Sequence, residues 1–421
     1  MTAGLGARSA ARIGGTLVAV LSLAVLVTVG YGWAQLHSSG VQLATADVIP
    51  AQPGPPATAS GALRQAQNIL LVGLDTRTDA QGNPLPAAVL DALHAGAVTD
   101  GGDSTDTMIV VHVPAGGGAV TGFSIPRDSY VDIPGYGTHK INSAYTYGQN
   151  VARTTLSGQG VSGSALHTQS AAAGARSAIA TVQQLTGLRI DHYAAVNLAG
   201  FAAISQAVGG VPVCLRAPVD DPYSGAVFPA GPQTVAGPAA LAFVRQRHGL
   251  PAGDLDRIRR QQVFATSLAH TVLAGGTLTD PATLSALLAA VRTNLTVDQG
   301  WDFTALLAQL QNLNPDTLSV STIPTGTAGL DTSDGQAVQV DPTQVQAYAR
   351  NLTTPEQPNP GVAGHGPTAQ TPATPGSLRT VPRADPRDDG VRSAVWTVPD
   401  PGPDHPAVRA AAAAAATGCV N

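Results

Sequence analysis

Charged residues and aromatic residues are both scarce in this chain of 421 residues. Only 12% of the residues are charged and 4% are aromatic, whereas 43% are hydrophobic, which excludes a disordered solvating protein and a coiled coil. The net charge of −5 argues against a broadly basic nucleic-acid-binding surface, so a site for a polyanion has to be a local cluster. Two cysteines cannot supply a four-cysteine zinc site. The length allows two to three domains, but 47 glycines and 32 prolines indicate that part of it is linker.

One long uncharged segment lies near the N-terminus. Residues 13–33 would form a helix of roughly 31 Å, which matches a bilayer core of about 30 Å. Arg8 and Arg12 precede this segment and no Lys or Arg follows it until Arg64, so the positive-inside rule places the rest of the chain outside the cytoplasm. The alternative is a cleaved signal peptide, with the small residues at 44–46 as the cleavage site.

The composition then divides the chain into segments. We expect a cytoplasmic tail at 1–12, a single-pass membrane helix at 13–33, an extracytoplasmic stalk at 34–66, a folded domain at 67–352 and a Pro/Ala-rich tail at 353–421. Inside the domain, the Gly, Ser and Ala content of 153–175 suggests a long loop that covers a site. Because disulfides persist outside the cytoplasm, Cys214 and Cys419 are expected to pair and to clip the tail to the domain.

Short β-branched runs alternate with segments of helical periodicity, which predicts an α/β domain with helices on both faces of the sheet. The predicted strands are 68–75, 107–113, 119–125, 193–197, 211–215 and 317–323. The predicted helices are 176–186, 198–208, 237–247, 254–274, 281–293 and 302–312.

Arginines cluster between positions 245 and 260. This stretch contains five of them: Arg245, Arg247, Arg257, Arg259 and Arg260. Helical spacing places Arg257 and Gln261 on one face, whereas Arg260 could form an ordinary surface ion pair with Asp256. Converging guanidinium groups are suited to bidentate binding of phosphate or carboxylate. The alternative is a solvated face whose arginines pair with nearby acids.

A second signal is the segment SIPRDSYVDIPGYGTHKIN at 124–142. Pro126 ends the preceding strand and places Arg127 and Asp128 on a loop at its carboxyl end, where ligands of α/β sheets gather. Lys140, the single lysine of the chain, lies in the same segment.

A third signal is a pair of acids at strand ends. Asp75 closes the first predicted strand and Asp106 opens the second, so antiparallel pairing would bring both carboxylates to one sheet edge. Two carboxylates with substrate phosphates and water suit Mg²⁺. Asp in an ordinary turn is the alternative interpretation. A general base is not identifiable, although an unligated Asp near the metal and His248 are candidates.

Five motifs in this order resemble the LytR-CpsA-Psr family of cell-wall glycopolymer ligases, in its actinobacterial branch. They are NILLVGLDTR, DTMIVVHV, SIPRDSYVDIPGYGTHKINSAYTYG, GGVPVCL and ALAFVRQRHGLPAGDLDRIRRQQ. The resemblance implies an α-β-α sandwich with a central mixed sheet and a hydrophobic interior that receives a lipid. It also implies a catalytic domain that transfers a glycan-phosphate from a polyprenyl diphosphate carrier to a peptidoglycan hydroxyl with Mg²⁺. The actinobacterial branch suggests arabinogalactan or a related polymer as the glycan.

The family motifs also imply roles for individual residues. Asp75 and Asp106 would hold the metal. The residues expected to contact the diphosphate are Arg127, Arg245, Arg247, Arg257 and Gln261, with Lys140, Arg260 and Asn142 as further substrate-binding residues. The arginine that commonly precedes the second acid is missing, and Asp103 competes with Asp106 for the metal role.

Two other classes of function would use the same cluster. A lipid-diphosphate phosphatase would use water as the acceptor. A non-catalytic wall-binding protein would use the arginines only to dock an anionic polymer.

Overall fold

The computed structural model describes residues 44–49, 66–100, 102–115, 119–251, 253–274, 280–301, 319–354 and 418–421. The predicted membrane segment at 13–33, the cytoplasmic tail and the predicted helix at 302–312 lie outside these ranges. Within the described ranges, no helix has both the length and the apolar character needed to span a bilayer.

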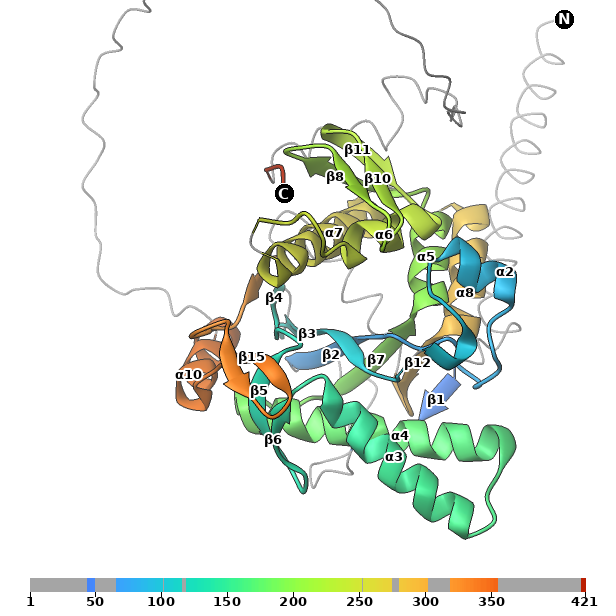
Figure 1. Ribbon diagram of the computed structural model, residues 1–421, viewed down its shortest axis with the longest axis vertical. Coiled ribbons are helices and arrows are strands. Elements are labelled where there is room, and N and C mark those ends of the chain that lie inside the picture. The colour runs from blue at the N-terminus through green and yellow to red at the C-terminus, as the bar shows by residue number, and fades with distance from the viewer. Residues whose placement is uncertain are drawn as a thin grey trace, which may run out of the picture.

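The centre of the molecule is a seven-stranded mixed sheet (Figure 1). Its strands, in spatial order, are β1 (Ala44–Ala46), β12 (Leu295–Asp298), β7 (His192–Asn197), β2 (Gln67–Leu74), β3 (Thr105–Val113), β4 (Thr121–Ser124) and β13 (Ser319–Thr322). The pairs β1–β12, β2–β7 and β4–β13 are parallel, and the other three pairs are antiparallel. The mixed central sheet predicted from the sequence is therefore confirmed.

Smaller sheets extend this core. One has the order β14 (Leu330–Thr332), β15 (Gly335–Gln339), β5 (Ser129–Ile133) and β6 (Gly137–Lys140). Two hairpin-like pairs join β8 (Val211–Leu215) to β11 (Gly231–Val235) and β9 (Val219–Asp221) to β10 (Ala226–Phe228).

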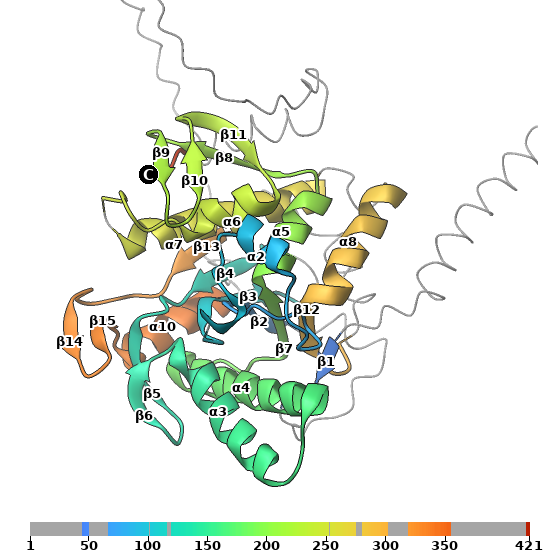
Figure 2. The same cartoon turned by 45° about the vertical axis from the view of Figure 1, so that its right-hand side comes forward.

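Helices cover both faces of the central sheet, as Figures 1 and 2 show from two directions. On one side lie α3 (Ser143–Gly158) and α4 (Gly163–Thr186), with α10 (Pro342–Thr353) packed against α4. On the other side lie α6 (Gly237–Arg245) and α7 (Asp254–Ala274). The remaining helices are α2 (Ala87–Ala92), the 3₁₀ turn η2 (Val98–Asp100), α5 (Leu198–Ala207) and α8 (Pro281–Asn294).

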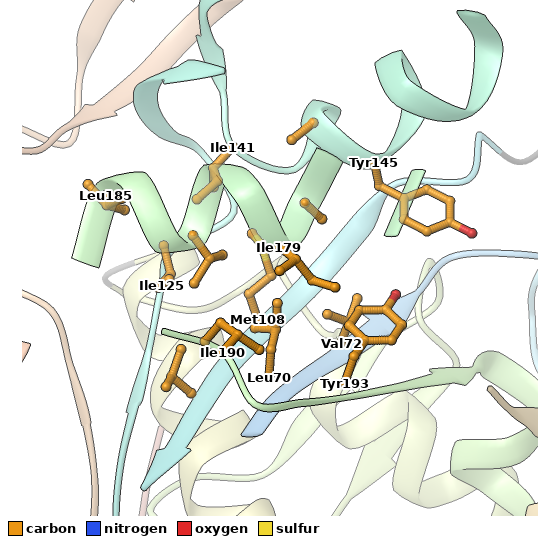
Figure 3. Packing of buried hydrophobic residues seen from close by; sticks show 14 of the residues in the cluster. Leu70, Val72, Met108, Ile125, Ile141, Tyr145, Ile179, Leu185, Ile190 and Tyr193 are labelled. Atoms are coloured by element: carbon orange, nitrogen blue, oxygen red, sulfur yellow. The ribbon is translucent and has the colours of Figure 1, made fainter. Parts of the chain in front are cut away.

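The main hydrophobic core lies between the sheet and α4 (Figure 3). Leu70 and Val72 of β2 and Met108 of β3 point to this side and are at most 2% exposed, as is Ile179 of α4. The alternation of a strand then sends Leu71 to the opposite face. Leu71 is 38% exposed although β2 is a central strand, so the face toward α6 and α7 is incompletely covered at this position.

The loop predicted at 153–175 is wrong, because this stretch belongs to the helices α3 and α4. Alanine is the best helix former, and the small residues serve close packing between the two helices. A Cβ at Gly148 would come within 2.6 Å of Ser177, and one at Gly174 within 2.8 Å of the Tyr145 carbonyl oxygen. The glycines therefore indicate a tight helix pair and not a mobile cover.

The fold also extends beyond the predicted domain limits of 67 and 352. Residues 44–46, placed in the stalk by composition and considered as a cleavage site, form β1 and pair with β12. Residues 418–421 dock beside β8, where the Val420 amide donates to the Cys214 carbonyl oxygen at 3.0 Å. The predicted disulfide between Cys214 and Cys419 is present.

Candidate functional site

The two predicted metal-binding acids lie at one edge of the central sheet. β2 and β3 pair antiparallel, with Leu74 opposite Thr105, and the Asp75 amide donates to the Ser104 carbonyl oxygen at 3.0 Å. The side chains of Asp75 and Asp106 are 23% and 32% exposed. Adjacent pairing of the two strands thus juxtaposes the acids, although they are 31 residues apart in the sequence.

A buried arginine orients Asp75. Arg77 is 8% exposed, and its Nη1 donates to the Asp75 carbonyl oxygen at 3.1 Å and lies 3.3 Å from Asp75 Oδ2. The other carboxylate oxygen, Asp75 Oδ1, is buried and has no hydrogen-bond partner within the described ranges. One oxygen of this carboxylate is therefore held by a cation while the other remains available for a further ligand.

Arg127 forms the opposite side of this edge. Its Nη1 donates to Asp106 Oδ1 at 2.8 Å, and its Nε lies 3.6 Å from Asp128 Oδ2. Asp128 Oδ1 in turn lies 3.4 Å from Lys140 Nζ. The structure therefore brings Arg127 and Lys140 together around Asp128, as an alternating row of charges that begins at Asp106.

Backbone contacts fix the loop that carries Arg127. The Asn142 amide donates to the Arg127 carbonyl oxygen at 3.1 Å, and the Thr105 amide donates to the Asn142 carbonyl oxygen at 3.3 Å. Asn142 precedes α3 and its side chain makes no capping hydrogen bond. The contacts of Asn142 in the structure thus join the loop to β3, and a role of its side chain in substrate binding stays a prediction.

Arg245 reaches the same edge through the segment that follows α2. At the C-terminus of α6, its Nη1 donates to the carbonyl oxygens of Leu93 and His94 at 3.2 and 3.3 Å. The next residue, Ala95, accepts from Arg77 Nε and Nη2 at 3.0 and 2.8 Å. Consecutive carbonyl groups therefore bind Arg245 and Arg77, which places Arg245 beside the arginine that holds Asp75.

Helix α7 is attached to the sheet next to the Arg127 loop. Gln262 Nε2 lies 2.7 Å from Ser124 Oγ and 2.7 Å from Thr322 Oγ1, at the ends of β4 and β13. Gln261 Nε2 lies 3.4 Å from the Val244 carbonyl oxygen, and Arg257, one turn earlier, is 3% exposed. The attachment holds the helix that carries Arg257 over the strand that leads to Arg127.

Two predicted arginines have other surroundings. Arg247 is exposed in the turn after α6. Arg260 is fully buried, with Nε donating to the Asn421 carbonyl oxygen, Nη1 donating to Gln246 Oε1 and its guanidinium 5.1 Å from the centre of the Phe243 ring. Burial lowers the Arg260 pKa to about 10, opposed by the nearby carboxylates. These contacts anchor the chain's last residue.

Asp256 forms an ion pair within α7. It is 2% exposed and lies 3.0 Å from Arg259 Nη1, at the i, i+3 spacing. His248, a candidate base, is 63% exposed and lies 3.7 Å from Asp221 with its ring against Tyr223. It lies among the residues of the β9–β10 hairpin.

Two residues of this region could not be identified from the sequence. Arg77 and Gln262 both make side-chain contacts that position the predicted residues. Each is adjacent or next but one to a predicted residue, and that proximity is the one signal that could have identified them.

Comparison with known proteins identifies relatives of this chain. The LytR-CpsA-Psr family model matches residues 40–354. The chain is 46% identical over 297 residues to the cell wall biosynthesis protein LcpA of Corynebacterium glutamicum, covering 70% of this chain and 57% of LcpA. It is 31% identical over 232 residues to the polyisoprenyl-teichoic acid–peptidoglycan teichoic acid transferase TagU of Bacillus mycoides, covering 55% of this chain and 66% of TagU.

A solved structure supports the fold. The LytR-Csp2A-Psr enzyme of Actinomyces oris superposes with a TM-score of 0.50 at 19% identity, over 74% of this chain and 96% of that one. The chain spans little more than half the length of LcpA, so the comparison concerns the shared domain. The family match over most of the chain, together with the corynebacterial relative, shows that the chain belongs to the LytR-CpsA-Psr family, in its actinobacterial branch.

Proposed function

We propose that this protein is a Mg²⁺-dependent phosphotransferase of cell-wall biosynthesis. It moves a glycan-phosphate from a polyprenyl diphosphate carrier to a hydroxyl group of peptidoglycan. The family supports a transferase, because the relative TagU is named as one that attaches a polyisoprenyl-linked teichoic acid to peptidoglycan. Arabinogalactan or a related polymer is the proposed glycan, on the resemblance alone.

The observation that carries the proposal is that Arg77 contacts only one of the two carboxylate oxygens of Asp75. Its Oδ1 is buried without a hydrogen-bond partner in the described part of the chain, which is costly for an anion unless a ligand binds there. No group of three or more His, Cys, Asp or Glu side chains forms a metal cage among the described residues. Two acids, Asp75 and Asp106, fit Mg²⁺, which takes one or two carboxylates and completes its shell with water and substrate phosphates.

The surrounding cations fit a diphosphate. Arg77, Arg127 and Arg245 approach the acid edge from three separate segments, and Lys140 lies behind Arg127. Phosphoryl transfer is catalysed mainly by positioning and charge stabilisation, so the side chains that hold these groups in place matter as much as their charge. Bound Mg²⁺ would supply further neutralisation of the phosphate oxygens.

The incompletely covered sheet face fits the lipid portion of the carrier. Leu71 is exposed to 38% in the middle of β2, and strand alternation places it on the face opposite to the buried Leu70 and Val72. Burying its exposed apolar surface against a polyprenyl chain would be favourable by about 25 cal/mol per Å². This face is the proposed lipid-binding interior.

The reaction breaks one bond and forms one bond at a single phosphorus atom. The acceptor hydroxyl oxygen attacks the phosphorus that bears the glycan, and the bond from that phosphorus to the bridging oxygen breaks. Polyprenyl phosphate leaves with the bridging oxygen, and the hydroxyl proton is released. Arg127 is placed to meet the charge that develops on the phosphate oxygens, while Asp106 and Asp128 keep its guanidinium oriented.

The disulfide supports the extracytoplasmic location, because the bond between Cys214 and Cys419 persists in an oxidising compartment. We propose that residues 13–33 anchor the chain in the cell membrane with the catalytic domain outside.

Identification of the products tests the proposal. The full chain in detergent is incubated with Mg²⁺ and a labelled polyprenyl diphosphate glycan, with or without peptidoglycan. Wall-bound label that requires both Mg²⁺ and peptidoglycan supports transfer, free glycan-phosphate in both arms indicates the phosphatase, and binding without turnover indicates the wall-binding protein. Asp75→Asn should abolish transfer, whereas the control Asp132→Asn, on the exposed part of β5, should retain it.

A further inference from the structure

A buried residue lies between two arginines in the loop that joins α6 to α7. Gln246 is 3% exposed, whereas Arg245 before it is half-buried and Arg247 after it is exposed. Gln246 ends α6 with extended backbone angles, φ −52° and ψ 134°. Successive side chains of an extended backbone point in different directions, so the inward side chain of Gln246 directs that of Arg247 away from the interior.

Both ends of the Gln246 side-chain amide form hydrogen bonds. Its Nε2 donates to the His248 carbonyl oxygen at 2.9 Å, which closes a short turn around Arg247. Its Oε1 accepts from Arg260 Nη1 and so attaches this turn to α7. Arg245 is held separately, by the carbonyl oxygens of the segment that follows α2. The position of Arg247 relative to Arg245 therefore depends on the Gln246 amide.

Arg260, which donates to Gln246, depends in turn on a residue distant in the sequence. Arg260 is fully buried, and its Nε donates to the Asn421 carbonyl oxygen. Its Nη2 has no hydrogen-bond partner within the described ranges. Because a buried charge that loses one of its few partners is strongly destabilised, the orientation of Arg260 toward Gln246 depends on Asn421.

Residues 418–421 are fixed against β8, as Figures 1 and 2 show. The Val420 amide donates to the Cys214 carbonyl oxygen at 3.0 Å, and the Val420 carbonyl oxygen accepts from the Arg216 amide at 2.8 Å. The disulfide of Cys214 adds a covalent link to the same segment. These contacts hold the Asn421 carbonyl oxygen in place beside α7.

We propose that Gln246 is a positioning residue for the donor diphosphate and that Asn421 acts on it through Arg260. Gln246 holds Arg247 beside Arg245, so that both guanidinium groups meet the phosphate oxygens. The identity of the ligand rests on the proposed function, whereas the position of the loop can be measured without any ligand.

Two variants break this connection at different points. Gln246→Glu keeps an acceptor for Arg260 but removes the amide that donates to the His248 carbonyl oxygen. The chain should therefore keep its thermal midpoint while the loop loosens. Deletion of residues 420–421 removes the acceptor of Arg260 Nε, keeps the disulfide and adds no charge near the arginines.

Each variant has a matched control. Gln233→Glu adds the same charge and removes an amide that donates to the Pro229 carbonyl oxygen at 2.8 Å, in a part of β11 outside the site. Asn421→Ala removes a side chain but retains the backbone carbonyl oxygen that accepts from Arg260.

The position of the loop is measured by limited trypsin digestion of the full chain in detergent, with the fragments identified by mass spectrometry. Both variants should increase cleavage after Arg247 about tenfold relative to cleavage after Arg189, which is 60% exposed and lies outside the loop. Both controls should leave this ratio unchanged. An equal increase after both arginines would show general destabilisation and would overturn the positioning role.

Ligand binding is measured by calorimetric titration of the same chains with inorganic pyrophosphate and Mg²⁺. Both variants should bind pyrophosphate about tenfold more weakly, and both controls should bind it as the unmodified chain does. If the unmodified chain and both variants bind pyrophosphate equally, the positioning role is refuted and the proposed function stands. An effect of Gln246→Glu without one of the deletion would overturn the part assigned to Asn421. Absence of binding by the unmodified chain would overturn the proposed function together with this inference.

Discussion

Arg77 allows the sharpest prediction, because it joins Asp75, the proposed metal ligand, to the segment that holds Arg245. Its guanidinium makes two hydrogen bonds to the Ala95 carbonyl oxygen and contacts both the carbonyl and the carboxylate of Asp75. Arg77→Lys keeps the charge but replaces this planar fork with a single ammonium group. The ammonium cannot reproduce contacts to both residues, so at least one buried carbonyl oxygen loses its partner.

The cost follows from that loss. A buried acceptor without a partner costs about 1–3 kcal/mol, so Arg77→Lys should lower the free energy of unfolding by about 2 kcal/mol. For a domain of this size, that is a fall in thermal midpoint of roughly 3 °C. Mutation of a residue that orients a metal ligand typically lowers metal affinity by 10–100-fold. The Mg²⁺ concentration for half-maximal transfer should therefore rise at least about tenfold.

The assay combines thermal unfolding with a Mg²⁺ titration of transfer by the full chain. The control is Arg189→Lys, where the arginine is 60% exposed and pairs with Asp191 at the surface, so both readouts should stay near those of the unmodified chain. If Arg77→Lys kept the original midpoint and the original Mg²⁺ dependence, the inference that Arg77 orients Asp75 would be wrong.

Three further predictions concern other parts of the molecule. Arg257→Ala should abolish transfer while the chain still folds, checked by product analysis beside circular dichroism, and normal turnover would remove Arg257 from the site. Replacing Cys214 and Cys419 together by Ser should lower the free energy of unfolding by up to about 5 kcal/mol, because the disulfide closes a loop between cysteines 205 residues apart in the sequence. An unchanged denaturation midpoint would contradict this. Burial lowers the pKa of His112, so below pH 6.5 the unfolded chain binds more protons and stability falls with decreasing pH. His112→Gln should lose less stability than the unmodified chain between pH 7 and pH 5, and equal losses would refute the assignment.

The features that the sequence predicted correctly depend on local patterns. Five of the seven central strands follow from short β-branched runs, whereas β1 and β12 were not predicted. The meeting of Asp75 with Asp106 follows from the pairing of two consecutive strands. The disulfide follows from the presence of two cysteines in a chain that the sequence predicts to be exported. In each of these cases the outcome requires no knowledge of which distant helix covers the sheet.

The features that could not be predicted from the sequence depend on contacts between distant segments. Helical spacing cannot show that Arg260 meets the last residue of the chain, because nothing in α7 encodes the path of the tail. Composition cannot separate a flexible Gly/Ser/Ala loop from a tight helix pair, because both are rich in the same small residues. Only the contacts at Gly148 and Gly174 show that these residues serve helix packing. The role of Arg77 depends on the carbonyl oxygen of Ala95, which has no side-chain signature.

The central claim is that Asp75 and the surrounding arginines act on a lipid-borne diphosphate with Mg²⁺. The most direct measurement is single-turnover transfer of labelled glycan-phosphate to peptidoglycan, at a range of Mg²⁺ concentrations, for the unmodified chain and for Asp75→Asn. We predict wall-bound product that forms with the unmodified chain only when Mg²⁺ is present, and none with Asp75→Asn at any Mg²⁺ concentration. Equal product from both chains, or product that forms without a divalent ion, would contradict the account.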